Sequence, residues 1–196
     1  MNDPVRFTRT WRVSASGGYD TAWGGFTEDA MHARGRAVAL EGGPYWVSYE
    51  LRTGPGYVTR SLRVRVEGPG PEVRATELLR DADGRWTVDG RARPDLDGAA
   101  DCDLGLCPLT NTMPVRRHGL HLAAGAAPAG PGHRFLMAWV SVPALAVVPS
   151  EQTYTPLGGG RVRYSSGTFS SDVLFDGDGL VLDYPGLATG LADNGT

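Results

Sequence analysis

Residues 57–67 read YVTRSLRVRVE, and this stretch decides the fold class. Every second residue from Leu62 to Val66 is apolar, and Arg63 and Arg65 lie between them. Alternation with a period of two is typical of a β-strand that has one buried and one solvated face. The stretch therefore predicts an antiparallel sheet whose apolar face covers a core.

Similar runs extend along most of the chain. They lie at 5–13, 37–40, 45–52, 72–79, 134–142, 162–166, 169–175 and 180–184. Asp-Gly pairs at 83–84 and 89–90 bracket a short strand, and the DGDG sequence at 176–179 is a hairpin turn signal. Short strands at a spacing of roughly ten residues predict an antiparallel barrel, roll or sandwich.

Helical signals are few. Segment 110–119 predicts a short helix, because Asn111 or Thr112 can cap its start and Pro114 fits its first turn. A second short helix is expected at 21–32, where a glycine pair argues against a long one. The fold class is therefore mainly β (α+β), with one or two short helices.

Length and composition indicate one globular domain over residues 1–196, with a flexible excursion rich in alanine, glycine and proline at 123–132. The net charge of −3 gives no electrostatic footprint for nucleic acid. No run approaches the roughly 18 apolar residues of a membrane span, and residues 1–11 do not resemble a signal peptide. We expect a soluble cytoplasmic protein in which Cys102 and Cys107 are thiols.

Residues 95–117 differ from their surroundings and are the first candidate for a site. The segment reads DLDGAADCDLGLCPLTNTMPVRR. Four carboxylates in it are able to bind calcium or to act as acid and base: Asp95, Asp97, Asp101 and Asp103. The glycine and the closing glutamate of a calcium loop are missing, which favours aspartates that cap turns and pair with arginine.

The cysteines and nearby histidines form no regular zinc pattern. Cys102 and Cys107 are followed by His118 and His121, a spacing unlike that of known structural sites. A catalytic thiol with His118 as its base is an alternative, but two semi-buried thiols are favoured. We expect no metal and no cofactor.

Arg116 and Arg117 are adjacent, so on a helix they project about 100° apart. One of them is expected to pair with Asp101 or Asp103 and to order the segment, while the other meets solvent or a ligand. An arginine fork matches a carboxylate or a phosphate equally well.

The aromatic residues leave two interpretations open. Tryptophans and tyrosines on strands are usually core residues, but a groove that they line binds a lipid or a sugar face. No nucleophile elbow, phosphate loop or dinucleotide fingerprint is present.

Several motifs together resemble one known family. They are LDG at 96–98, DCDL at 101–104, PLTNTMPVRR at 108–117, RW at 85–86, AWV at 138–140, QTY at 152–154 and GLVLDYPGL at 179–187. In these the chain resembles the putative glycolipid-binding family of bacterial proteins. It departs from that family at Ala99, where a cysteine is usual, and at Cys102, where an aliphatic residue is usual.

The resemblance implies a spiral β-roll similar to the carriers of outer-membrane lipoproteins, in which a curved sheet plugged by helices encloses a hydrophobic concavity. We accordingly expect a non-enzymatic protein that binds a lipid, glycolipid or other amphiphilic ligand. The residues expected to contact it are Trp86, Asp101, Asp103, Thr110, Asn111, Arg116, Arg117, Trp139, Tyr154 and Tyr164.

Two alternatives remain open. One is an enzyme on a small polar or anionic substrate, with Asp101 or Asp103 as the base and Arg116 as an anion clamp. The other is a structural or self-associating module. The oligomeric state and the identity of the ligand do not follow from the sequence.

Overall fold

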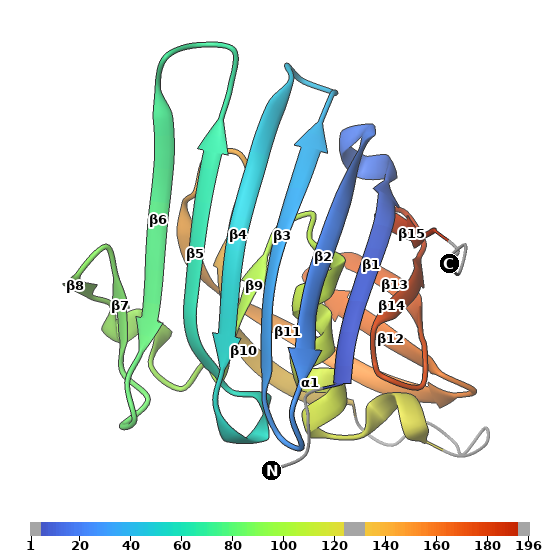
Figure 1. Ribbon diagram of the computed structural model, residues 1–196. Helices are drawn as coiled ribbons and strands as arrows, with labels where there is room; N and C mark the ends of the chain where they lie inside the picture. Colours follow the sequence, from blue (N-terminus) through green and yellow to red (C-terminus); the bar gives the residue numbers. More distant parts are fainter. Residues whose placement is uncertain (1–4, 124–131, 192–196) are drawn as a thin grey trace.

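The computed structural model describes residues 5–123 and 132–191. Its strands form one 15-stranded sheet in the order β8-β7-β6-β5-β4-β3-β2-β1-β15-β14-β13-β12-β11-β10-β9. All neighbours are antiparallel except β9 and β10, which run parallel. The expected curved antiparallel sheet of a mainly β protein is thus confirmed (Figure 1).

The sheet has two halves that meet where β1 pairs with β15. The N-terminal half-sheet comprises β1 (Val5–Val13), β2 (Gly18–Phe26), β3 (Met31–Ala39), β4 (Tyr45–Thr53), β5 (Thr59–Glu67), β6 (Val73–Arg80), β7 (Trp86–Val88) and β8 (Arg91–Ala92). The C-terminal half-sheet comprises β9 (Asp101–Leu104), β10 (His133–Val140), β11 (Val147–Gly158), β12 (Arg161–Ser166), β13 (Phe169–Phe175), β14 (Val181–Tyr184) and β15 (Ala188–Gly190).

The helical elements are short. They are the α-helix α1 (Thr112–Arg117) and the 3₁₀ turns η1 (Ser14–Ser16), η2 (Pro55–Tyr57), η3 (Pro94–Leu96), η4 (Pro108–Asn111) and η5 (Leu120–Leu122). Figure 1 shows the C-terminal strands crossing behind the N-terminal layer, with α1 between the two. No helix in the described ranges has the length and apolar character to cross a bilayer.

The roll closes where β9 lies against the inside of β5. The amide of Thr59 donates to the Ala100 carbonyl at 3.0 Å, and the Thr59 hydroxyl accepts from the Cys102 amide at 3.0 Å. Thr59 and Cys102 are both 0% exposed, so the edge of β9 is covered rather than left open to other strands.

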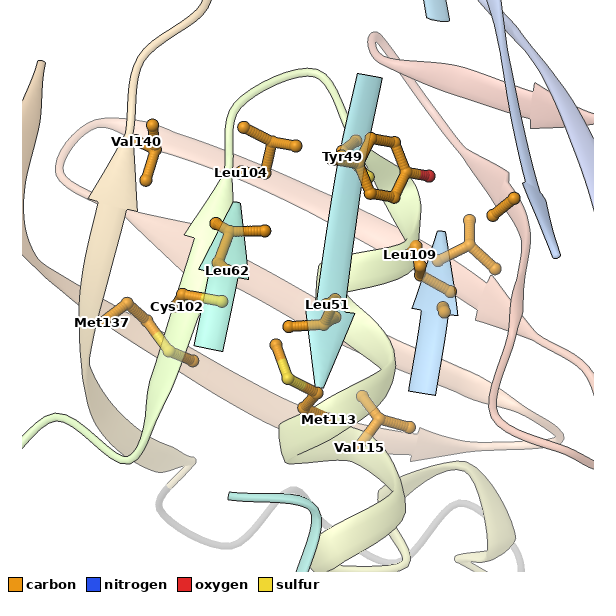
Figure 2. Close-up of a cluster of buried hydrophobic side chains, with 14 of the residues drawn as sticks. Tyr49, Leu51, Leu62, Cys102, Leu104, Leu109, Met113, Val115, Met137 and Val140 are labelled. Carbon is orange, nitrogen blue, oxygen red and sulfur yellow. The ribbon is translucent and has the colours of Figure 1, made fainter. Parts of the chain in front are cut away.

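The main core lies between the N-terminal half-sheet and the η4–α1 segment. Leu51 of β4 lies beside Met113 of α1, and Leu62 of β5 lies beside Cys102 of β9, and all four are buried (Figure 2). A fully buried leucine or methionine contributes about 1.5–3 kcal/mol relative to an exposed one. This packing is what fixes η4 and α1 in place.

The predicted helix at 110–119 is confirmed by η4 and α1, although the side chain of Asn111 does not cap it. The helix expected at 21–32 is wrong, because the segment is occupied by β2 and β3. Gly24 is needed there as a strand residue, since a Cβ at this position would lie 2.2 Å from the His32 carbonyl oxygen. The excursion expected at 123–132 falls mostly outside the described residues.

The predicted DGDG turn joins β13 to β14. The carboxylate of Asp176 accepts hydrogen bonds from the amides of Asp178 and Leu180, at 3.0 and 2.9 Å. The short strand expected between the two Asp-Gly pairs is β7. Both predictions are therefore confirmed, because local turn chemistry alone specifies these hairpins.

Candidate functional site

The inner face of the C-terminal half-sheet is polar and aromatic. Residues two apart on a strand share a face, and the strand pairing places polar side chains of neighbouring strands beside one another. They are Asp101, Asp103, Ser150, Gln152, Tyr154, Tyr164, Ser166 and Ser171. Such a face under a helical plug is a candidate site, because buried polar groups need partners or a ligand.

Asp101 is neutralised inside the protein. Arg117 Nη1 donates to Asp101 Oδ1 at 2.7 Å, and Arg117 Nη2 donates to the second carboxylate oxygen. The Asp101 side chain is 1% exposed. Burial raises the pKa of Asp101, and the Arg117 guanidinium opposes that rise. The expected acid–arginine pair is confirmed, and it ties β9 to the end of α1.

Arg116 points elsewhere. Its guanidinium lies over the Phe26 ring, with Cζ 4.0 Å from the ring centroid, and 5.0 Å from that of Tyr57. It donates to the carbonyl of Asp178. Arg116 therefore joins α1 to the N-terminal half-sheet and to the β13–β14 turn, and it does not converge with Asp101 or Asp103.

Asp103, unlike Asp101, has no arginine partner among the residues that the structure describes. Its Oδ1 accepts from the Thr110 hydroxyl at 2.8 Å, and its Oδ2 accepts from Gln152 Nε2 at 2.6 Å. It takes part in no ion pair within the described part of the chain. Burial raises the pKa of Asp103, and the Gln152 and Thr110 hydrogen bonds lower it.

Two more side chains complete the Asp103 network. The Tyr154 hydroxyl lies 3.1 Å from Gln152 Oε1 and 3.0 Å from Asn111 Oδ1. A phenol has one proton, so it donates to one of these oxygens only. The other oxygen receives no proton from Tyr154. Asn111, which carries one of these two oxygens, also lines a cleft.

The cleft lies beside Asp103 and has a volume of about 540 Å³. Its walls come from β9–β14 and from three connecting turns. Its lining residues are Asp103, Leu104, Gly105, Leu106, Cys107, Asn111, Trp139, Val142, Ser150, Tyr164, Ser166, Phe169, Tyr184 and Leu187. A concave, mostly apolar surface with a few polar groups is the usual form of a small-molecule site.

The aromatic walls of the cleft support one another. The Tyr164 ring lies 5.8 Å from that of Tyr184 and 6.0 Å from that of Phe169. Phe169 is 45% exposed, whereas Tyr164 and Tyr184 are nearly buried. The cleft therefore grades from a solvated aromatic edge to a polar interior at Asp103.

The residues predicted from the sequence separate into three groups. Asp103, Asn111, Trp139 and Tyr164 line the cleft, and Thr110 and Tyr154 lie directly behind them. The pair of Asp101 and Arg117, together with Arg116, has other partners. Trp86 is 1% exposed and donates its indole N–H to the Ala99 carbonyl at 3.0 Å, outside the cleft.

Sequence reasoning missed five polar or aromatic members of the site: Ser150, Gln152, Ser166, Phe169 and Tyr184. The alternation of Ser150, Gln152 and Tyr154 along one strand was a usable signal. It shows that these side chains share a face. It does not show that the face turns inward, because a polar alternation normally faces solvent.

Asp20 is a further buried carboxyl that was not predicted from the sequence. Asp20 is 0% exposed on the inner face of β2, and the Tyr49 hydroxyl lies 3.1 Å from its Oδ1. Burial raises the pKa of Asp20 to about 7, and hydrogen bonds from Cys107 and Tyr49 oppose the rise. A hollow of about 20 Å³, room for about one water, adjoins this group.

The cysteines are free and buried, at 0% exposure for Cys102 and 4% for Cys107. Burial raises the pKa of Cys102 to about 12, which makes its thiol unreactive at neutral pH. Nowhere in residues 5–123 and 132–191 do three potential metal ligands from His, Cys, Asp and Glu come together.

These features define a class: a rolled, open β-sheet with a helical plug and an aromatic cleft that ends on an uncompensated carboxyl. The chain belongs to the putative glycolipid-binding family, whose model matches residues 8–190. The family inferred from the sequence motifs is therefore confirmed.

One solved structure has the same fold. It is the crystal structure of a DUF1089 family protein from Pseudomonas aeruginosa, with a TM-score of 0.70 and 32% sequence identity. The match covers 88% of this chain and 92% of that one. A search of the curated proteins gives no match.

Proposed function

We propose that the cleft binds an amphiphilic molecule with an uncharged, hydroxylated head group, such as a glycolipid, and that the protein performs no chemistry on it. The observation that carries this proposal is Asp103, a carboxyl that opens onto an aromatic cleft and has no cationic partner. A carboxylate and an amide oxygen accept hydrogen bonds from hydroxyl groups, and aromatic faces pack against the C–H side of a sugar ring.

The charge of the site limits the head group. Asp103 has hydroxyl and amide partners only, and Arg116 and Arg117 are held by other groups. An anionic head group would lie next to a carboxylate without a compensating cation, which disfavours it. The family description, putative glycolipid-binding, agrees with a sugar head group.

The arrangement gives little support to catalysis. Asp101 is paired with Arg117, and Arg116 lies against Phe26. The aspartate base and the Arg116 clamp that the enzyme alternative requires therefore do not face one substrate. Asp103 alone faces the cleft. A binding site for a neutral head group needs only this one acceptor and its neighbours.

Native mass spectrometry with octyl glucoside, and with octyl sulfate as the anionic counterpart, tests the proposal. We expect a complex with the glucoside and none with the sulfate. Trp139→Ala should weaken glucoside binding about tenfold, since it removes an aromatic wall. Trp23→Ala, a half-buried tryptophan on the outer face of β2, is the matched control and should bind normally. Equal binding of both detergents, or equal loss in both variants, would refute the proposal.

A further inference from the structure

The outer face of the N-terminal half-sheet has an apolar rim at one end. The rim consists of Tyr19, Val38, Leu40 and Trp46. Cross-strand pairing places Tyr19 beside Val38 and Val38 beside Trp46, so these three form one continuous row over β2, β3 and β4. Trp46 is 63%, Leu40 56% and Tyr19 47% exposed. Contiguous exposed apolar surface of this kind marks an interaction site.

The strand ends that carry the rim also pack toward one wall of the cleft. The small hollow beside Asp20 is lined on one side by Val38, Ala39 and Tyr45, and on the other by the turn from Leu104 to Cys107. The same turn forms a wall of the 540 Å³ cleft. The strand ends that carry the rim on their outer face therefore contact, on their inner face, a turn that also lines the cleft.

The rest of this outer face is basic. Four cross-strand rows over β1–β6 present seven arginines and three glutamates to solvent, in a chain whose net charge is −3. The arginines are Arg6, Arg12, Arg34, Arg36, Arg52, Arg63 and Arg65, and the glutamates are Glu50, Glu67 and Glu77. Within the described residues Arg12 and Arg36, which flank the rim, form no ion pair. Such a face is complementary to an anionic surface.

Aromatic and aliphatic side chains next to free guanidinium groups fit the boundary layer of a lipid bilayer. Tryptophan and tyrosine prefer the level of the head groups, and arginine pairs with lipid phosphates. We infer that the apolar rim and its flanking arginines dock the protein onto an anionic bilayer. If the proposed function holds, this contact would keep the end of the roll that carries the 104–107 turn near the membrane from which an amphiphilic ligand enters.

Co-sedimentation with vesicles tests the docking surface. Vesicles of phosphatidylcholine alone are compared with vesicles that contain about one third phosphatidylglycerol. We expect binding to the anionic vesicles only, and weaker binding as salt is added. The variant Tyr19→Ser/Leu40→Ser/Trp46→Ser should partition at least about tenfold less, because it removes the apolar contact.

A matched control uses exposed apolar residues away from the rim, two on strands β1 and β6 and one in η5. Val5, Leu79 and Leu122 are 60%, 39% and 68% exposed, and Val5→Ser/Leu79→Ser/Leu122→Ser should bind vesicles like the unaltered protein. Arg36→Glu should weaken binding to anionic vesicles, whereas Arg134→Glu, at a site with an 80% exposed side chain, should not. Unchanged thermal unfolding of each variant verifies that the fold is intact.

Absence of vesicle binding by the unaltered protein, or equal binding by the rim variant and its control, overturns the inference. It is also overturned if the rim variant instead dissociates a dimer in size-exclusion chromatography, which would make a second copy the occupant. The result is separable from the proposed function. Trp139→Ala should weaken glucoside binding and leave vesicle binding unchanged, and the rim variant should weaken vesicle binding and leave glucoside binding unchanged.

Discussion

The two halves of the sheet turn very different inner faces toward the same helical plug. The N-terminal half presents Leu51, Leu62 and Leu78, all 0% exposed. The C-terminal half presents Asp101, which accepts hydrogen bonds from Arg117. It also presents Asp103, which accepts hydrogen bonds from Thr110 and Gln152. The N-terminal half contacts the plug mainly through apolar side chains, whereas the C-terminal half adds hydrogen bonds and a buried ion pair to it. In the function proposed above, the cleft that binds the ligand lies on the C-terminal half.

The strongest test of this comparison is the Asp101–Arg117 pair. Arg117→Leu would leave a buried carboxylate without a counter-charge, so we expect the free energy of unfolding to fall by about 3–5 kcal/mol. Arg163→Leu breaks the exposed pair with Asp172 and should cost about 1 kcal/mol or less. Urea unfolding measures both. Equal losses would show that the buried Asp101–Arg117 pair contributes no more to stability than the exposed pair of Arg163 and Asp172.

A test on the apolar half should separate stability from binding. Leu62→Ala is expected to lower the free energy of unfolding by about 2–5 kcal/mol, because it leaves a cavity in the core. Leu79→Ala, at a 39% exposed position on the next strand, should cost far less. Octyl glucoside affinity, measured on the folded protein, should be unchanged in both. A loss of affinity in Leu62→Ala would contradict the division between the halves.

Asp20 is the exception within the apolar half and gives the smallest expected effect. Its pKa is raised to about 7, above the ordinary value near 4, so the folded state binds the proton more tightly. Its contribution to stability is therefore retained at low pH and lost as the pH rises from about 4 to 7.

Asp20→Asn should remove this dependence. At pH 8 the variant is expected to be more stable than the unaltered protein by about 1–3 kcal/mol, and at pH 4 the difference should vanish. Thermal unfolding across the pH range measures this, and Asp97→Asn, at an exposed site, is the control. A parallel pH profile for Asp20→Asn would show that folding does not raise the pKa of Asp20.

Much of the fold follows from local sequence. Period-two runs such as Leu62–Val66 specify strands with one buried face, and Asp-Gly turns specify the hairpins around β7 and before β14. The helix predicted at 21–32 was wrong, because the pairing of β2 with β3, which is non-local, overrode a weak helical pattern. The motif-rich segment at 95–117 correctly indicated the family, and it indicated that an arginine of 116–117 pairs with Asp101 or Asp103.

The sequence by itself determined the fold class and the family, and four of the ten residues that it predicted to contact a ligand line the cleft: Asp103, Asn111, Trp139 and Tyr164. Only the tertiary structure decided which arginine pairs with which aspartate, and that Trp86 lies in the core and not in the cleft. The physical reason is that alternation along a strand places side chains on two faces but does not say which face is inside. Rolling the sheet makes that choice, and it leaves Asp103 without a cation at the end of an aromatic cleft.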